Sequence, residues 1–133
     1  MEKHVTSLEL SKRLKELGAP QKSEFYWCPI PKIGENGKSY FDSWDIQHKD
    51  HMRYFGKKIR VSAFLTSELG EIMKSKGMGV VAYSSIQGKW WCSGGKWDAG
   101  KQAYDGLQQS DTMQDALGLM LEYLIQNKMI GGI

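Results

Sequence analysis

The sequence contains only two cysteines, Cys28 and Cys92, and three prolines. Two cysteines are too few for the disulfide framework of a small secreted domain, so we expect reduced thiols. No apolar run approaches the roughly 20 residues that a membrane-spanning helix requires. The N-terminal segment MEKHVTSLEL is charged where a secretory signal would be apolar. These absences predict a cytoplasmic protein that does not act on a membrane.

Motifs that identify a reaction are also missing. The glycines form neither a GxGxxG fingerprint nor a P-loop. The HxxH pair of His48 and His51 supplies only two of the ligands that zinc requires. Asp42 and Asp45 flank Trp44, but no second polar cluster near them could hold a substrate. We therefore predict a binding protein rather than an enzyme, with no metal and no cofactor.

The length and composition fit one ordinary globular domain. The chain has 133 residues, of which 41% are hydrophobic and 25% are charged. These values are close to the averages of folded proteins, and the length is that of a single domain. We expect residues 1–133 to form one domain with its own hydrophobic core.

Three helices are predicted from capping residues and apolar spacing. The first covers 7–17, with Thr6 and Glu9 as a capping box and Gly18 as the residue that ends it. The second starts near Thr66 and ends at Gly77. The third starts at Asp111 or Thr112 and ends near Asn127. One face of the third helix carries seven apolar residues: Met113, Ala116, Leu117, Met120, Leu121, Leu124 and Ile125.

The remaining segments predict antiparallel strands. Residues 24–30 and 38–44 flank an Asn-Gly turn signal and form one expected hairpin. Residues 78–85 and 89–93 form a second, which Gly94 and Gly95 are expected to break, and 96–109 offers a weak strand pair. Residues 45–62 show no clear period and are predicted irregular. The expected fold is α+β, a mainly antiparallel sheet packed with about three helices in an α/β/α-like sandwich.

Three blocks of the sequence carry a resemblance to a known group of proteins. The stretches SLELSKRLKELGAPQKSEFYW, AFLTSELGEIM and MLEYLIQNKMI resemble small accessory proteins encoded by phages and prophages, mostly of Gram-positive bacteria. These proteins are of the α/β/α-sandwich type. The resemblance implies this fold and a bacterial host cell, and it carries no active-site residues. Gly118 in the last helix and a long 94–109 insert depart from the pattern.

Positive charge is concentrated in one short segment. Residues 48–60 hold five lysines and arginines and one aspartate, a net charge of +4. The rest of the chain holds 13 basic and 14 acidic side chains, so it is nearly neutral. Nucleic-acid-binding proteins usually spread positive charge over a whole face. A compact basic segment is more typical of a site for a compact anion, such as a phosphate-bearing ligand or an acidic patch on a partner.

A nucleotide-binding site is the functional hypothesis that follows. Lys57, Lys58 and Arg60 precede a predicted helix start, where partial positive charge favours phosphate. Aromatic residues are expected to form the walls on which a base could stack: Trp44, Tyr54, Trp90, Trp91 and Trp97. The expected partner is a small phosphorylated, nucleotide-like ligand, and the expected role is counter-defence, in which the protein acts as a sponge for a signalling nucleotide.

Other interpretations of the same residues stay open. The tryptophans could be core residues and the lysines solubilising ones. The aromatic residues could form an interface that inhibits a host defence or regulatory protein. A third alternative is nucleic-acid binding, and the sequence leaves a homo-oligomer open.

Overall fold

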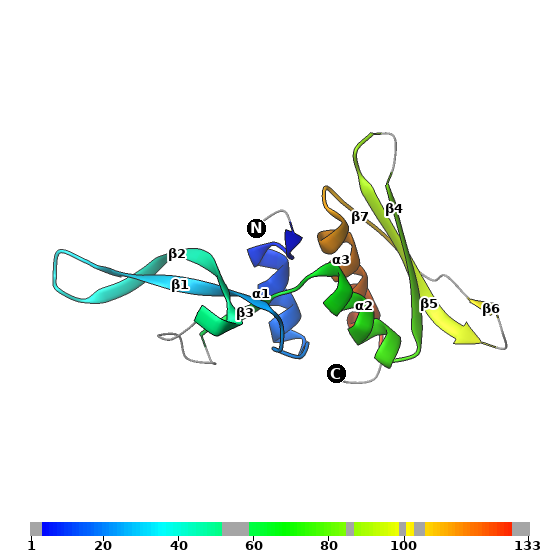
Figure 1. Cartoon of the computed structure of the whole chain (residues 1–133), viewed down its shortest axis with the longest axis horizontal. Helices are drawn as coiled ribbons and strands as arrows, with labels where there is room; N and C mark the ends of the chain where they lie inside the picture. The colour runs from blue at the N-terminus through cyan, green and yellow to red at the C-terminus, as the bar shows by residue number, and fades with distance from the viewer. Residues whose placement is uncertain (1–3, 52–58, 85–86, 99–100, 103–105, 129–133) are drawn as a thin grey trace.

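The computed structural model describes residues 4–51, 59–84, 87–98, 101–102 and 106–128. This part of the chain forms three α-helices and two antiparallel sheets, which confirms the predicted α+β fold. The strands divide between the sheets by their order in the chain, and the helices lie between the two sheets (Figure 1). Within this part of the chain, no helix is long and apolar enough to cross a bilayer.

The first half of the chain builds one helix and one sheet. Helix α1 spans Leu8–Glu16, and strands β1 (Phe25–Ile33) and β2 (Ser39–His48) form the predicted hairpin. A short 3-10 turn, η2 (Lys49–His51), follows β2, and β3 (Val61–Ala63) completes the sheet in the order β2-β1-β3. The expectation that 45–62 is irregular is wrong at both ends of that segment. Its first residues extend β2, and its last residues pair with β1.

The second half builds two helices and the other sheet. Its elements are α2 (Thr66–Ser75), β4 (Met78–Ser84), β5 (Trp90–Asp98), β6 (Lys101–Gln102), β7 (Gly106–Ser110) and α3 (Met113–Gln126). Strand β4 pairs antiparallel with β5, so the second predicted hairpin is present. Of the weak strand pair expected in 96–109, only the short pairing of Trp97 and Asp98 with β6 is found there, whereas β7 pairs with Trp90–Gly94 of β5. The expected break at Gly94 and Gly95 is wrong, because β5 continues through both residues.

Helix α3 lies at the centre of the main core. It packs across β5 and β7, and α1 and α2 pack against it (Figure 1). Leu117, Leu121 and Leu124 are buried as predicted, together with Leu14 of α1 and Leu69 of α2. A second, smaller cluster joins Val5, Trp27, Val61 and Ala63 under the first sheet. The two clusters lie on either side of α1, so this helix connects both halves of the chain.

The start of α1 differs in detail from the predicted capping box. The N-cap is Ser7, whose side chain accepts a hydrogen bond from the Leu10 backbone N–H at 3.4 Å. The Thr6 hydroxyl oxygen instead accepts the Phe64 N–H at 3.0 Å, where the chain leaves β3. The Ser7 N–H donates to Asp115 Oδ1 of α3 at 2.7 Å. Thr6 and Ser7 therefore tie the start of α1 to β3 and to α3. Helix α3 is itself capped by Thr112.

Gly118 is explained by the contact between α1 and α3. A Cβ atom at this position would lie 2.6 Å from Leu10 Cδ2 and 3.2 Å from Thr6 Cγ2. The missing side chain thus lets α1 approach α3 closely. Gly70 lies in the interior of α2, and a Cβ atom there would have no neighbour within 4 Å. The two glycines therefore form a matched pair, one required by packing and one not.

We predict opposite effects for alanine at these two glycines. Gly70→Ala should stabilise the protein by about 0.5–1 kcal/mol, because alanine favours the helix more than glycine does. Gly118→Ala has the same helix benefit but overpacks a buried contact, at a cost of roughly 1–3 kcal/mol, and should destabilise the protein. Denaturant unfolding measures both. A Gly118→Ala variant as stable as Gly70→Ala would contradict the close α1–α3 contact.

Cys28 and Cys92 are both reduced thiols and are buried in different parts of the core. Burial raises the pKa of the Cys92 thiol to about 12, and burial also raises the pKa of the Cys28 thiol. A thiol with a raised pKa stays protonated and unreactive near neutral pH. Neither cysteine is therefore suited to act as a nucleophile.

The raised pKa of Cys92 predicts a loss of stability at high pH. The folded state keeps the Cys92 proton while the unfolded state releases it, so the free energy of unfolding should fall as the pH rises from about 9 towards 12. Cys92→Ala should remove this part of the pH dependence. At pH 8, an alkylating reagent should modify Cys92 only after unfolding. Rapid modification of the native protein at Cys92 would contradict its burial.

Candidate functional site

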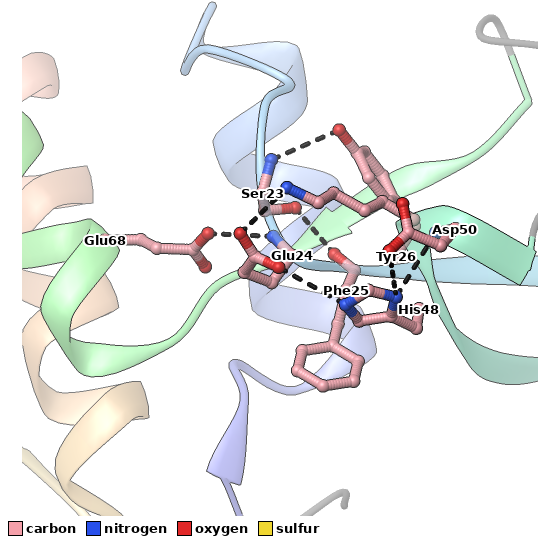
Figure 2. A network of polar contacts seen from close by, with 8 residues as sticks. Ser23, Glu24, Phe25, Tyr26, His48, Asp50 and Glu68 are labelled. Atoms are coloured by element: carbon pink, nitrogen blue, oxygen red, sulfur yellow. Dashed lines mark hydrogen bonds and ion pairs between the residues drawn. The ribbon is translucent and has the colours of Figure 1, made fainter.

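The β1–β2 register brings a charged cluster together at one end of the first sheet. Phe25 lies opposite His48, so Glu24 and Lys49 lie beside each other just beyond the paired residues. The Lys49 backbone N–H donates to the Glu24 carbonyl at 2.8 Å and extends the ladder by one step. Figure 2 shows the resulting network of polar contacts, which joins the start of β1, the end of β2 and helix α2.

Glu24 is the centre of this cluster. Its carboxylate accepts hydrogen bonds from Lys49 Nζ at 3.0 Å and from His48 Nε2 at 3.3 Å. The hydrogen bond from Lys49 is the main reason why the pKa of Glu24 lies below its usual value. Glu24 is therefore ionised at neutral pH, and its charge is balanced by the neighbouring lysine.

His48 is held in one tautomer by its two neighbours. The Asp50 backbone N–H donates to His48 Nδ1 at 3.2 Å, so this nitrogen carries no proton. The ring proton therefore lies on Nε2, which donates to Glu24. Because both ring nitrogens are engaged within the protein, His48 offers no free lone pair for general-base catalysis. Its arrangement is that of a structural histidine.

Glu68 of α2 connects the helix to the sheet. Its Oε1 accepts the Leu65 N–H at 2.8 Å and its Oε2 accepts the Glu24 N–H at 2.9 Å. A carboxylate at this position also interacts favourably with the positive end of the helix. The prediction placed a bound phosphate at the start of this helix, but the Glu68 side chain already occupies that position.

A cavity of about 530 Å³ opens next to this network. Its volume lies in the range of small-molecule sites, roughly 300–1,000 Å³. The lining comes from the loop before β1, from β1 itself, from η2 and from α2: Pro20, Lys22, Ser23, Glu24, Tyr26, Lys49, Ser67, Glu68, Glu71 and Ile72. Pro20 and Ile72 provide apolar wall. The charged residues provide hydrogen-bonding groups at the edge.

Arg60, one of the predicted anion-binding residues, lies next to this cavity wall. Its guanidinium lies 4.4 Å from the centre of the Tyr26 ring, a cation–π contact. The Tyr26 hydroxyl accepts the Ser23 N–H at 3.1 Å and donates to the Gln21 carbonyl at 3.2 Å. Tyr26 is buried, so it offers a ligand only part of its edge.

Trp44 lies on the same sheet but is not part of the cavity lining. It is half-buried against the smaller core cluster, and Lys12 Nζ lies 4.8 Å from its ring centre. Trp44 and Arg60 therefore belong to the first half of the chain, as predicted for a shared site. Each, however, already has a partner from within the protein.

Trp90 and Trp91 lie on opposite faces of the second sheet. Trp90 shares a face with buried Cys92 and packs against the main core, so it is a core residue. Trp91 is the next residue along the strand and points to the other face, where it is half-buried and Leu107 of β7 is exposed. The structure thus does not bring Trp90 and Trp91 together as two walls of one site. Strand β5, which carries both residues, lies across the helices from β2, which carries Trp44 (Figure 1).

The remaining predicted site residues cannot be placed in the same way. Tyr54, Lys57 and Lys58 lie outside the described residues, so their part in an anion site stays a prediction. Trp97 is part of strand β5, but its side chain lies outside what the structure describes.

Sequence reasoning missed the residues that line the cavity. Lys49 belongs to the basic segment but was not among the predicted site residues. Glu24 and Glu68 lie 44 positions apart, and no sequence pattern indicates that they meet in the fold. The one available signal was Glu68 itself, because glutamate at the third position of a helix often bonds back to the residue before the helix.

Comparison of the chain with protein-family models, with curated proteins and with solved structures finds no match. Among the described residues, no group of three or more histidine, cysteine or acidic side chains could hold a metal ion. The geometry of the cavity and its charges are therefore the features that bear on function.

We predict that Glu68 has a structural role that its neighbour Glu71 does not share. Glu68→Gln keeps the size of the side chain but leaves one backbone N–H facing an amide NH₂ group. This change should cost about 1–3 kcal/mol of stability. Glu71→Gln, three residues later on the same cavity wall, should change stability by less than about 0.5 kcal/mol. Urea unfolding of both variants is the measurement, and equal stabilities would refute the role of Glu68.

Proposed function

We propose that the chain is a small accessory protein that acts by occupancy and binds a nucleotide-like ligand in the cavity between α2 and β1. The observation that carries this proposal is the cavity itself, which has a ligand-sized volume and two lysines, Lys22 and Lys49, in its lining. A nucleotide requires an apolar surface for its ring and cationic groups for its phosphate. Pro20 and Ile72 supply the first, and Lys22 supplies the second.

The balance of charges around the cavity supports an amphoteric ligand. Glu24 is balanced by Lys49, and Glu68 uses both oxygens on backbone N–H groups. Within the described residues, this leaves Lys22 and Glu71 facing the cavity without a protein partner. Lys22 fits a phosphate, and Glu71 fits the amino or hydroxyl donors of a base or ribose. A ligand with both kinds of group satisfies both residues.

The biological setting of the proposal comes from the resemblance to phage and prophage accessory proteins. A small phage protein that binds a nucleotide tightly could remove a signal used in host immunity. Binding without turnover is enough for this role. It agrees with the engaged state of His48 and with the buried, protonated thiols.

Calorimetric titration with mono-, di- and cyclic nucleotides and with adenosine-diphosphate-ribose tests the proposal. We expect at least one to bind more tightly than about millimolar. Charge-assisted hydrogen bonds contribute about 1.5–3 kcal/mol, so Lys22→Ala should weaken binding by about 10- to 100-fold. Lys74→Ala is the matched control, because Lys74 lies exposed in the last turn of α2 and does not line the cavity.

Two results would overturn the nucleotide proposal. One is that no compound of the panel binds, and the other is that Lys22→Ala binds as tightly as the parent protein. The inhibitor of a host protein would then be the better proposal, with a stable complex on gel filtration as its sign. Binding of nucleic acid, the third alternative, would show a steep loss of affinity with added salt.

A further inference from the structure

His48 lies at the junction of β2 and η2, next to Glu24 and Lys49 of the cavity lining. Figure 2 shows its imidazole between Glu24, at the start of β1, and Asp50 of η2. Its Nε2 lies 3.3 Å from Glu24 Oε2, and its Nδ1 lies 3.6 Å from Asp50 Oδ2. The His48 side chain is 31% exposed, so it can exchange protons with solvent.

The neutral ring uses only one of these two carboxylates. Its Nε2–H donates to Glu24, while Nδ1 accepts the Asp50 backbone N–H at 3.2 Å. This second bond joins the last residue of β2 to η2. Because Nδ1 carries no proton in this state, the ring donates no hydrogen bond to the Asp50 carboxylate.

Protonation has to change this arrangement, because both ring nitrogens of an imidazolium are donors. Nδ1 can then no longer accept the Asp50 N–H, and the Asp50 carboxylate 3.6 Å away becomes its acceptor. The bond to Glu24 is kept and gains strength, because both of its partners are then charged. Histidine is the side chain whose charge ordinarily changes between about pH 5 and 8. The geometry thus provides each protonation state of His48 with its own partners.

Within the described part of the chain, the ionisable groups around the ring are Glu24 from β1 and Lys49, Asp50 and His51 from η2. The centre of the His51 ring lies 5.8 Å from that of the His48 ring. Glu68 of α2 joins the group by accepting the Glu24 N–H at 2.9 Å. The two carboxylates nearest the ring and the one lysine sum to a charge of −1 when the ring is neutral, and to zero when it is protonated.

We propose that His48 is a proton-operated switch at the edge of the cavity, which exchanges the Asp50 N–H for the Asp50 carboxylate on protonation. The exchange releases one bond between β2 and η2 and adds a positive charge beside Glu24 and Lys49. Its consequence for binding rests on the proposed function, because the added charge attracts the phosphate of a nucleotide. Acidification therefore favours the nucleotide-bound state, and a bound nucleotide favours the protonated ring.

NMR of the free full chain between about pH 8 and pH 5.5 tests the exchange itself. The ring nitrogen shifts of His48 should show a proton on Nε2 alone at high pH and on both nitrogens at low pH. The Asp50 amide should shift with the same midpoint, because it loses its acceptor. His48→Gln offers a donor and an acceptor but no titrating proton and should abolish this shift, whereas the matched control His51→Gln should keep it.

Two results of this NMR titration would overturn the switch. One is a proton on Nδ1 of His48 at pH 8, since the Asp50 N–H would then have no acceptor to lose. The other is an Asp50 amide shift that persists in His48→Gln. Circular dichroism of both variants reports whether they remain folded.

Calorimetric titration with adenosine-diphosphate-ribose gives the second readout. Adenosine monophosphate is unsuited, because a terminal phosphate itself titrates near about pH 6. Adenosine-diphosphate-ribose should bind at least about threefold more tightly at pH 5.5 than at pH 8, and His48→Gln should remove this difference while His51→Gln keeps it. Equal binding at both pH values would show that the charge of His48 does not act on the cavity. If no nucleotide binds at either pH, the proposed function fails, and the NMR titration still decides whether His48 exchanges its partners.

Discussion

The pairing of β1 with β2 is the constraint on which the rest of the first half depends. At one end, the match of Phe25 with His48 sets Lys49 beside Glu24 and forms one wall of the cavity. At the other end, beyond an irregularity in the register between Ile30 and Pro31, Pro31 is matched with Phe41. A slip of one residue would invert every side chain of β2. The wall of the cavity that Glu24 and Lys49 form would then be lost. The cavity lies where the hairpin meets α2, and Glu68 fixes that junction by bonding to backbone N–H groups on both sides.

The sequence predicted the elements well because their signals are local. The apolar spacing of the third helix placed Leu121 and Leu124 in the core, and both are fully buried. Turn residues located both hairpins. The role of Gly118 was not predictable, because its cause is the approach of Leu10 from another helix. Alternation along a strand would have separated Trp90 from Trp91, had it been applied to that pair.

The candidate site was harder to predict because it depends on contacts between distant segments. Positive charge in 48–60 drew attention to the region of Lys49, but it gave no sign of the carboxylates opposite. Glu24 and Glu68 meet only because the loop before β1 packs against α2. The tryptophans carried the aromatic signal, yet Trp90 serves the core and Trp44 is partly buried against Lys12. Composition alone does not distinguish these roles.

The most direct test of the account is an amide NMR titration of the full chain with adenosine monophosphate and adenosine-diphosphate-ribose. Such a titration reports where a ligand contacts the protein as well as whether it binds. We predict that the largest shifts fall on residues 20–26, on Lys49 and on residues 67–72, which border the cavity. Shifts centred on Trp91 and Leu107 of the second sheet, or no shifts at millimolar ligand, would contradict the nucleotide-binding account.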